Sequence, residues 1–414
     1  MPLLHRLDLG YDPKGNGRLQ GTEVIEFRND SPVPLDRVTL RLWANGPDGC
    51  RPRRITVTVE APAEAEPQQV RCSALPVRLG QPVEPGASSS LGLSFTVRGR
   101  KARERFGRSN GVRLFGNTIP LLAVTGDDGV TRLPRHTSFA ESFYSLTSAW
   151  EATLRLPAGQ QAATTGAVVD ERVEGGQRML EVATPQARDF GLAFGKWLTV
   201  SGSAAGTNVR VHAQSRRRGR RMLSVARRSL RRFSSRFGAY GSPELEVVEL
   251  AEGYGMEYPE LVFSVDDDYV VSHEVAHQWW YSIVGNDQYR EPWLDESFAT
   301  YSAAKVEGTL SFCKRRAPFA WLDAPFRGMK LDRGMGFWAS RDQAYQLVVY
   351  DTGACVLRWL ERRIGRARMT AFLRLLVSRH RHGVLTKPDL MAALAETAPG
   401  LGLKRFRRLA HVSG

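Results

Sequence analysis

Two histidines and a glutamate in one short run could bind and use a metal ion: the run is His273-Glu274-Val275-Ala276-His277. On a helix, residues four apart lie on one face, so both imidazoles can reach the same ion. Glu274 follows the first histidine and can lean over an open coordination position, where it would take a proton from an attacking water. Alone, this short pattern also fits two surface histidines on an ordinary helix.

A third ligand is needed, because a catalytic zinc site has three protein ligands and one open position. Eighteen residues separate His277 from Glu296, which directly follows Pro292-Trp293-Leu294-Asp295. Proline suits the first turn of a helix, and a carboxylate between apolar neighbours is seldom buried unless it is paired or coordinated. The alternative for Glu296 alone is a salt-bridged helix glutamate. Together, the residues predict one zinc ion per chain, bound by His273, His277 and Glu296, with Glu274 as general base.

The elements that must position these residues differ between the two halves of the chain. Residues 1 to about 200 contain short alternating runs separated by turn residues, which indicates an antiparallel β domain. These runs are 22–28, 37–43, 55–59, 91–97 and 152–157. Near residue 205 the glycine- and serine-rich loop 201–206 separates this part from a more helical one. We therefore predict an α+β protein, with an N-terminal β domain over 1–205 and a mainly helical catalytic domain over 206–414.

The second half is expected to contain few strands and several helices. The strands are 209–212, 245–250 and 260–264, and the helices are 268–285, 293–307, 343–364, 368–380 and 387–397. Another helix is expected over 219–237, because apolar residues recur there at three- and four-residue steps. Its opposite face carries six arginines. That face could bind an anionic surface, but such faces are more often simply solvated.

Charge and hydropathy narrow the possible partners and locations. The net charge is +15, and the basic residues are spread along the whole chain. No recognition motif accompanies them, so nucleic acid is not expected as a partner. The N-terminus lacks the apolar core of a secretory signal, and no segment approaches the roughly 18 apolar residues of a membrane span. As written, the chain is expected to be cytoplasmic; a truncated start would allow a secreted or membrane-associated protein.

The cysteines give no sign of a structural metal site. Cys50, Cys72, Cys313 and Cys355 form no C-x-x-C pair. Cys50 and Cys72 could bridge in an exported protein, but free buried thiols are the expectation. The sequence does not define an oligomeric state.

Four motifs together give the chain a family resemblance. His-Glu-x-x-His followed by eighteen residues and then Glu is the zinc signature of the gluzincins, and HEVAHQWW and WLDESFATY resemble the aminopeptidase N and leukotriene hydrolase family. The segment 253–259 (GYGMEYP) resembles that family's Gly-x-Met-Glu-Asn motif, and 350–354 (YDTGA) resembles its tyrosine segment. The segment 187–190 (ARDF) is similar to part of the family's N-terminal domain.

The resemblance implies a saddle-like β domain followed by a thermolysin-like domain, and a zinc aminopeptidase that acts on peptides with a free N-terminus. Tyr350 would donate a hydrogen bond to the oxyanion, with Tyr345 as the weaker candidate. The substrate-binding residues would be Gly255, Met256, Glu257 and Glu141. Glu257 would hold the α-ammonium group, which restricts the enzyme to chain ends because only a terminus carries that charge.

The sequence departs from the family pattern at three places. Tyr258 stands where the family motif has asparagine, Asp295 stands where many members have asparagine, and the chain ends soon after the tyrosine segment. Without the large C-terminal helical domain of the long members, a more open active site is expected. Two alternatives accompany this interpretation: an inactive peptide-binding relative, and a zinc endopeptidase, against which Glu257 argues.

Overall fold

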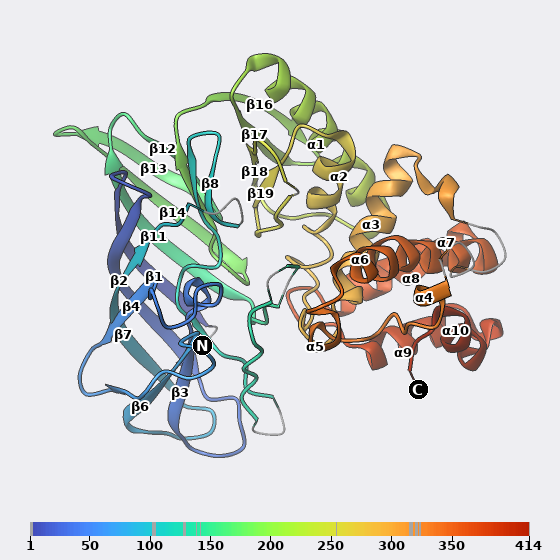
Figure 1. The fold of residues 1–414 in the computed structure, drawn as a ribbon, viewed down its shortest axis with the longest axis horizontal. Helices are drawn as coiled ribbons and strands as arrows, with labels where there is room; N and C mark the ends of the chain where they lie inside the picture. Colours follow the sequence, from blue (N-terminus) through green and yellow to red (C-terminus); the bar gives the residue numbers. More distant parts are fainter. Residues whose placement is uncertain are drawn as a thin grey trace.

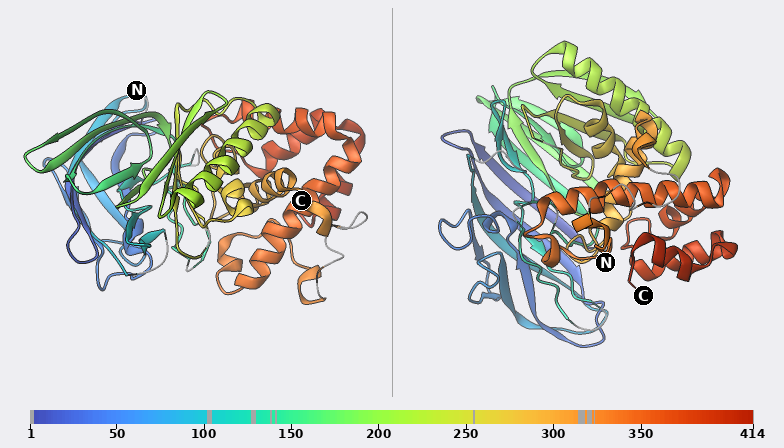
Figure 2. Two further views of the ribbon diagram at one scale, coloured as in Figure 1. Left: turned by 90° about the horizontal axis from the view of Figure 1, so that it is seen from above. Right: turned by 45° about the vertical axis from the view of Figure 1, so that its right-hand side comes forward.

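The computed structural model describes residues 3–101, 105–126, 130–137, 139–140, 142–253, 255–313, 318, 322 and 324–413. Strands occupy the first half of the chain and helices most of the second, and the two halves lie side by side (Figures 1 and 2). The predicted α+β fold class is therefore confirmed.

A seven-stranded sheet is the largest element of the N-terminal half, with the strand order β13-β14-β11-β1-β2-β7-β4. Its neighbouring strands are antiparallel except β1 and β11, which run parallel. The strands are β1 (Leu4–Asp12), β2 (Arg18–Arg28), β4 (Ile55–Val59), β7 (Ser88–Arg98), β11 (Ser148–Pro157), β13 (Ala167–Glu174) and β14 (Gln177–Ala187). Alternate side chains, such as Leu19, Ile25 and Phe95, are buried because successive residues of a strand point to opposite faces.

Two smaller antiparallel sheets complete this half. One has the order β10-β3-β6-β5, with β3 (Leu35–Arg41), β5 (Glu64–Ala65), β6 (Ala74–Val83) and β10 (Leu121–Leu122). The other has the order β12-β15-β9-β8, with β8 (Phe106–Ser109), β9 (Val112–Phe115), β12 (Gln161–Thr164) and β15 (Leu192–Gly195). Apolar residues of all three sheets share one core, in which Leu9, Leu75 and Phe194 are buried.

A fourth sheet, β16-β17-β18-β19, begins the second half. Its strands are β16 (Leu198–Ala204), β17 (Thr207–Ala213), β18 (Glu244–Glu249) and β19 (Leu261–Ser264). Helix α1 (Arg216–Phe237) joins β17 to the parallel strand β18. It begins after the Ser215 cap, three residues before the predicted start at residue 219, and ends at Phe237, the predicted last residue. Because β16 pairs with β17 across residue 205, the division at that position stays a prediction.

The remaining elements are mostly helical. The α-helices are α2 (Asp268–Ala276), α3 (Trp293–Glu307), α4 (Ala324–Arg327), α5 (Met335–Trp338), α6 (Asp342–Tyr345), α7 (Gly353–Ile364), α8 (Arg366–Arg379), α9 (Lys387–Thr397) and α10 (Leu403–Ala410). Short 3-10 turns are η1 (Trp43–Asn45), η2 (Leu310–Phe312) and η4 (Pro399–Leu401), and η3 (Gln346–Thr352) is a π-helix. Among the described helices, none combines the length and apolar character needed to cross a membrane.

Two predicted helices differ from the structure. The helix expected over 268–285 ends at Ala276, and beyond its cap residue the amide of Gln278 bonds only three residues back, to Val275. Further along, Gly285 pairs with Val384 near the C-terminus, so a distant segment redirects the chain. The helix expected over 343–364 is interrupted by the π-helix η3. The local periodicity of the sequence indicates neither the pairing of Gly285 with Val384 nor the π-helix.

Both cysteine pairs are disulfides, so the expectation of free thiols is wrong. The Cα atoms lie 5.2 Å apart in Cys50–Cys72 and 5.1 Å apart in Cys313–Cys355. The first bond joins the loop after η1 to a turn before β6, and the second joins the end of η2 to α7. These pairs are brought together by the packing of distant elements, which cysteine spacing does not reveal.

Glu361 on α7 is a buried carboxylate that binds three cations. Its side chain is 4% exposed and accepts hydrogen bonds from Arg236, Lys305 and Arg358. Burial raises the pKa of this carboxyl, but the hydrogen bonds and charges of the three cations prevail and lower the pKa to about 2. The folded state therefore favours the ionised carboxylate.

We expect Glu361→Gln to lower the free energy of unfolding by about 2–4 kcal/mol at neutral pH, because three cations lose their common partner. The folded-state pKa is depressed from 4.5. The stabilisation is therefore complete above pH 4.5 and is lost as the pH falls toward 2. Urea unfolding of both proteins at pH 7 and near pH 3 measures this. If the difference in the free energy of unfolding between the two proteins is as large near pH 3 as at pH 7, the ionised Glu361 is not its source.

Candidate metal centre and active site

Helices α2 and α3 bring two histidines and one glutamate together. Asp267 caps α2 by accepting the amide of Val270 at 3.0 Å, and the helix then presents His273 and His277 on one face. Their Nε2 atoms lie 3.0 Å apart. Glu296, in the first turn of α3, places Oε2 at 3.3 Å from Nε2 of His273 and 3.4 Å from Nε2 of His277. The predicted ligand set is thus assembled in one place.

The donor set fits a zinc ion. In the described part of the chain, these three residues form the one group of His, Cys, Asp or Glu whose ligand atoms converge, within 4.8 Å of one another. All three side chains are buried, and Oε2 of Glu296 accepts no hydrogen bond from any described residue. A buried carboxylate oxygen without a donor calls for a cation, and two imidazoles with one carboxylate leave a fourth position of a tetrahedral zinc site open.

Asp295 orients one of the imidazoles. Its Oδ1 lies 2.7 Å from Nδ1 of His277, which also lies 3.0 Å from the carbonyl of Trp280. Oδ2 of Asp295 accepts a hydrogen bond from Gln288 at 2.5 Å. With Nδ1 facing two acceptors, the proton of a neutral His277 belongs on Nδ1, which leaves Nε2 free to bind metal. The aspartate found here in place of asparagine therefore contacts a ligand directly.

We expect Asp295→Asn to weaken zinc binding by about 10- to 100-fold, because an amide cannot supply the negative charge that makes the imidazole a stronger donor. Competition against a chromogenic chelator measures the zinc Kd without any need for turnover. Gln288→Ala, which removes only the support behind Asp295, should cause a smaller loss. An unchanged zinc Kd for Asp295→Asn would show that the charge of the carboxylate does not affect zinc binding by His277.

Glu274 lies against the segment that carries the Gly-x-Met-Glu motif. Its side chain is 4% exposed, and Oε2 has no hydrogen-bond partner among the described residues. A Cβ atom at position 255 would overlap with Oε1 of Glu274, so only glycine fits there. Burial, followed by the charges of Glu257 and Glu296, raises the pKa of the Glu274 carboxyl well above its usual range. The motif glycine therefore allows the carboxylate and the segment to approach closely.

Met256 and Glu257 lie along the outer side of β19. Met256 exchanges two backbone hydrogen bonds with Phe263, at 2.8 and 2.9 Å, which extends the sheet by one bridge. The side chain of Glu257 is 5% exposed. Its charge contributes to raised pKa values of Asp189 and Asp295, after burial as the main cause. This concentration of carboxylates suits an ammonium group. The predicted Glu141 lies outside the described residues.

Tyr350 lies beside a metal-ligand candidate. Its ring is 5.8 Å from that of His273 and nearly parallel to it, at 17°. Tyr350 is half-buried on the π-helix η3, whereas Tyr345 is fully buried and packs edge-on against it at 5.5 Å. Single π-helical turns are frequent at functional sites. Of the two tyrosines named from the sequence, Tyr350 is the one adjacent to the histidine ligand.

The tyrosine that replaces the family's asparagine packs into the N-terminal half. The hydroxyl of Tyr258 donates to Oδ1 of Asn117 at 3.1 Å, and the side chain is 2% exposed. A Cβ atom at position 116 would overlap with this hydroxyl, so Gly116 makes room for it. Tyr258 therefore joins the motif segment to the β half.

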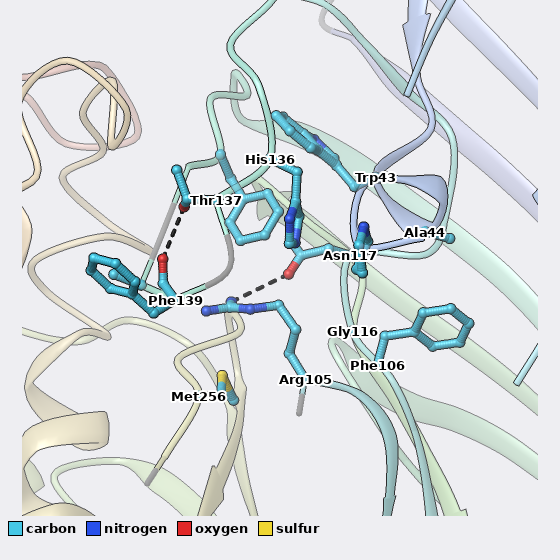
Figure 3. Close-up of a pocket in the computed structure, with 13 residues that line it drawn as sticks. Trp43, Ala44, Arg105, Phe106, Gly116, Asn117, His136, Thr137, Phe139 and Met256 are labelled. Carbon is cyan, nitrogen blue, oxygen red and sulfur yellow. Dashed lines mark hydrogen bonds between the residues drawn. The ribbon is translucent and has the colours of Figure 1, made fainter. Parts of the chain in front are cut away.

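A pocket opens next to Met256, between the motif segment and the β half (Figure 3). Its apolar walls are Trp43, Phe106, Phe139 and Phe143. Arg105, Asn117 and His136 add polar groups, and the guanidinium of Arg105 reaches Oδ1 of Asn117 at 3.4 Å. Burial lowers the pKa of His136 to about 4, with nearby arginines adding to the effect, so this imidazole is neutral at pH 7. Sequence analysis missed these residues because they carry no motif.

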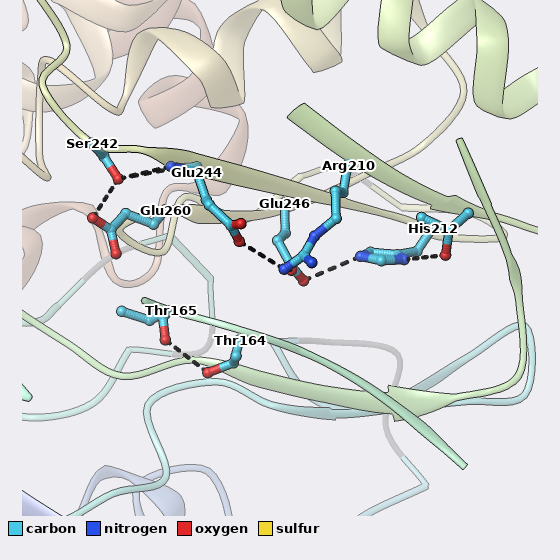
Figure 4. A network of polar contacts seen from close by, with 9 residues as sticks. Thr164, Thr165, Arg210, His212, Ser242, Glu244, Glu246 and Glu260 are labelled. Carbon is cyan, nitrogen blue, oxygen red and sulfur yellow. Dashed lines mark hydrogen bonds and ion pairs between the residues drawn. The ribbon is translucent and has the colours of Figure 1, made fainter. Parts of the chain in front are cut away.

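Polar contacts fasten the motif segment to the β half. Glu260 accepts hydrogen bonds from Ser242 at 2.6 Å and from Thr184 of β14 at 3.2 Å. Thr165 donates to the carbonyl of Pro259 at 2.8 Å. In the fourth sheet, the side chain of Glu246 on β18 is held between Arg210 and His212 of β17 (Figure 4). The segment that carries Glu257 is thus fixed from both halves of the chain.

Comparison with known proteins finds a family match in the second half of the chain. The Peptidase family M1 domain matches residues 265–409. The predicted resemblance to the aminopeptidase N-like gluzincins is thereby confirmed. Rice aminopeptidase M1-B (Oryza sativa subsp. japonica) is 27% identical over 59% of this chain and 32% of its own length. Tricorn protease-interacting factor F2 of Thermoplasma acidophilum is 24% identical over 44% of this chain and 27% of its own length.

Solved structures support the same fold over a greater length. The M1 zinc metallopeptidase of Deinococcus radiodurans superposes with a TM-score of 0.71 at 19% identity. The match covers all of this chain and 93% of that one. A mutant of a two-domain M1 zinc metallopeptidase bound to L-arginine superposes with a TM-score of 0.71 at 18% identity, over 100% and 94% of the two chains. The chain spans about a third of the length of the curated relatives it matches.

Proposed function

We propose that the protein is a zinc aminopeptidase that removes the first residue of peptides with a free N-terminus. The observation that carries the proposal is the close approach of two parts of the site. Gly255 lets the segment ending in Glu257 lie directly against Glu274, which sits on the same helix as two of the three metal-ligand candidates. A group that recognises a chain terminus is therefore placed beside a group that can activate water.

Each residue takes one role in this proposal. His273, His277 and Glu296 would hold the zinc ion, which when bound supplies Lewis-acid polarisation of the scissile carbonyl. Glu274 accepts a proton from the attacking water and passes it to the leaving amine. Tyr350 donates a hydrogen bond to the developing oxyanion. Gly255 and Met256 present the backbone edge along which the substrate lies, and Glu257 binds the α-ammonium group, with Glu141 as a second contact.

The surroundings of the site suggest further features of the proposal. The pocket beside Met256 would receive the side chain of the first substrate residue. The division into domains 1–205 and 206–414 is retained as part of the proposal, with the active site between them. Both cysteine pairs are disulfides, which favours an oxidising compartment over the cytoplasmic location predicted from the N-terminus.

Glu257→Ala is expected to raise KM for peptides with a free N-terminus by about 10- to 100-fold, because a charge-assisted contact to the ammonium contributes about 1.5–3 kcal/mol. The weak cleavage of N-acetylated peptides should change less than twofold. Glu257→Gln keeps the volume and removes the charge, so it should resemble Glu257→Ala.

The comparison of free and acetylated peptides separates the proposal from its alternatives. Equal losses on the two substrate types would remove the terminus-recognition role of Glu257 and favour a zinc endopeptidase. Binding of peptides with no turnover, in protein that contains one zinc per chain, would favour the inactive peptide-binding relative.

A further inference from the structure

A second pocket, independent of the proposed active site, lies where three helices meet. Its walls come from the C-terminal end of α1, the second half of α3 and the first turns of α8, and its volume is about 430 Å³. Four of the side chains that line it are basic: Arg232, Arg236, Lys305 and Arg366. None of its lining residues is acidic, and none is a residue of the candidate active site. The pocket is therefore a concave, positively charged site.

The positive charge of this basic pocket is only partly neutralised. Arg236 and Lys305 share one carboxylate, Glu361, which also accepts a hydrogen bond from Arg358 at 2.6 Å. Three cations thus use a single negative charge. Arg232 and Arg366 form no ion pair with any residue in the described ranges. A net positive charge therefore remains where the three helices meet.

Hydrogen-bond donors that lack acceptors accompany this charge. Nε of Arg236 is buried and has no hydrogen-bond partner among the described residues. Helix α8 begins after Gly365, which has no side chain to cap the first amides, and its first turn contains no acidic residue. Arg366 and Thr370, which line the pocket, belong to the first two turns of this helix. An anion here would meet guanidinium groups and the positive end of the helix dipole together.

We propose that the basic pocket binds a phosphoryl group. A phosphoryl group carries close to two negative charges and three terminal oxygens, which can meet several guanidinium groups at once. A single carboxylate has one charge and two oxygens and would leave part of the site uncompensated. The pocket is concave and its cations come from three helices, which suits a small phosphorylated molecule or free phosphate rather than a flat anionic membrane.

Binding to the zinc-loaded protein tests the proposal. Isothermal titration with inorganic phosphate, and separately with glycerol 3-phosphate, is carried out at constant ionic strength with chloride as the balancing salt. The pocket variant Arg232→Ala/Arg366→Ala is compared with Arg217→Ala/Arg231→Ala, which removes two charges from the outer face of α1 without touching the pocket. All four arginines are exposed, so both variants should retain the fold.

The pocket variant is expected to raise the Kd at least tenfold, and the control variant to change it less than twofold. Tighter binding of glycerol 3-phosphate would identify a phosphorylated small molecule as the ligand, and tighter binding of inorganic phosphate would identify the free ion. If both variants raise the Kd equally, the binding is a general attraction of anions to a basic protein, and the proposal is overturned. The proposal is also overturned if the intact protein does not bind either ligand at millimolar concentration.

Discussion

The Glu274→Gln variant is expected to keep its zinc and to lose about 10²- to 10⁴-fold in kcat, the range that a positioned general base supplies. The amide has nearly the same shape as the carboxylate but cannot accept a proton from water. The close approach of position 255 to Oε1 of Glu274 leaves no room for a compensating rearrangement. The KM for free peptides should change little, because Glu257 is untouched.

Zinc content and turnover must be measured on the same sample for this variant. Glu307→Gln is the matched control, since Glu307 lies at the end of α3 and pairs with Arg228 rather than with the site. Retained zinc with an unchanged kcat would exclude Glu274 as the base. Loss of zinc together with turnover would give Glu274 a structural role in the metal site instead.

Tyr350→Phe is expected to lower kcat by about 10²- to 10³-fold, the usual effect of removing one donor to an oxyanion. Phenylalanine keeps the ring that lies parallel to His273, so zinc binding and folding should be preserved. The effect should fall on kcat rather than KM, because the hydrogen bond forms mainly as charge develops in the transition state.

Tyr345→Phe is the matched control for the tyrosine prediction. Tyr345 is fully buried behind Tyr350 and should change kcat by less than about tenfold, because its ring packing is retained. If Tyr345→Phe lowers kcat at least tenfold more than Tyr350→Phe does, Tyr345 would be the donor to the oxyanion instead of Tyr350. A change in KM alone for Tyr350→Phe would place its hydroxyl in substrate binding.

The metal-ligand set could be predicted because it depends on local rules. Residues four apart on a helix share a face, and a glutamate between apolar neighbours needs a partner, so His273, His277 and Glu296 follow from spacing and composition. The alternation of the first half likewise predicts a β domain. Gly255 was noted in the sequence only as part of a motif. The structure shows why a glycine is needed there, because the Glu274 carboxylate occupies the space that a side chain would take.

Other features depend on contacts between distant segments and could not be predicted in this way. Helix α2 ends at Ala276 although the sequence continues with helix-compatible residues, because the segment after it pairs with residues near the C-terminus. The π-helix that carries Tyr350 has no known sequence signal here. The pocket beside Met256 is lined by residues of the β half, whose positions follow only from how the two halves pack.

Arg188 illustrates how a motif residue can be structural. It is fully buried and donates to the carbonyls of Ser145, at 3.0 Å, and Gly383, at 3.0 Å, so it joins the β half to the C-terminal helices. Its Nε also reaches the carbonyl of Ser282, five residues beyond His277. Arg188 of the segment 187–190 named from the sequence thus holds the chain that follows α2 against the β half.

The most direct test of the central claim is the hydrolysis of a panel of aminoacyl fluorogenic amides, each with its N-acetylated twin. Rates are measured before chelation, after chelation, and after zinc is added back. The account predicts that the free-amine substrates are cleaved far faster than their acetylated twins. This cleavage is lost on chelation and restored by zinc, and the same data give the side-chain preference of the pocket beside Met256. Comparable cleavage of the acetylated twins, or cleavage that persists without zinc, would contradict it.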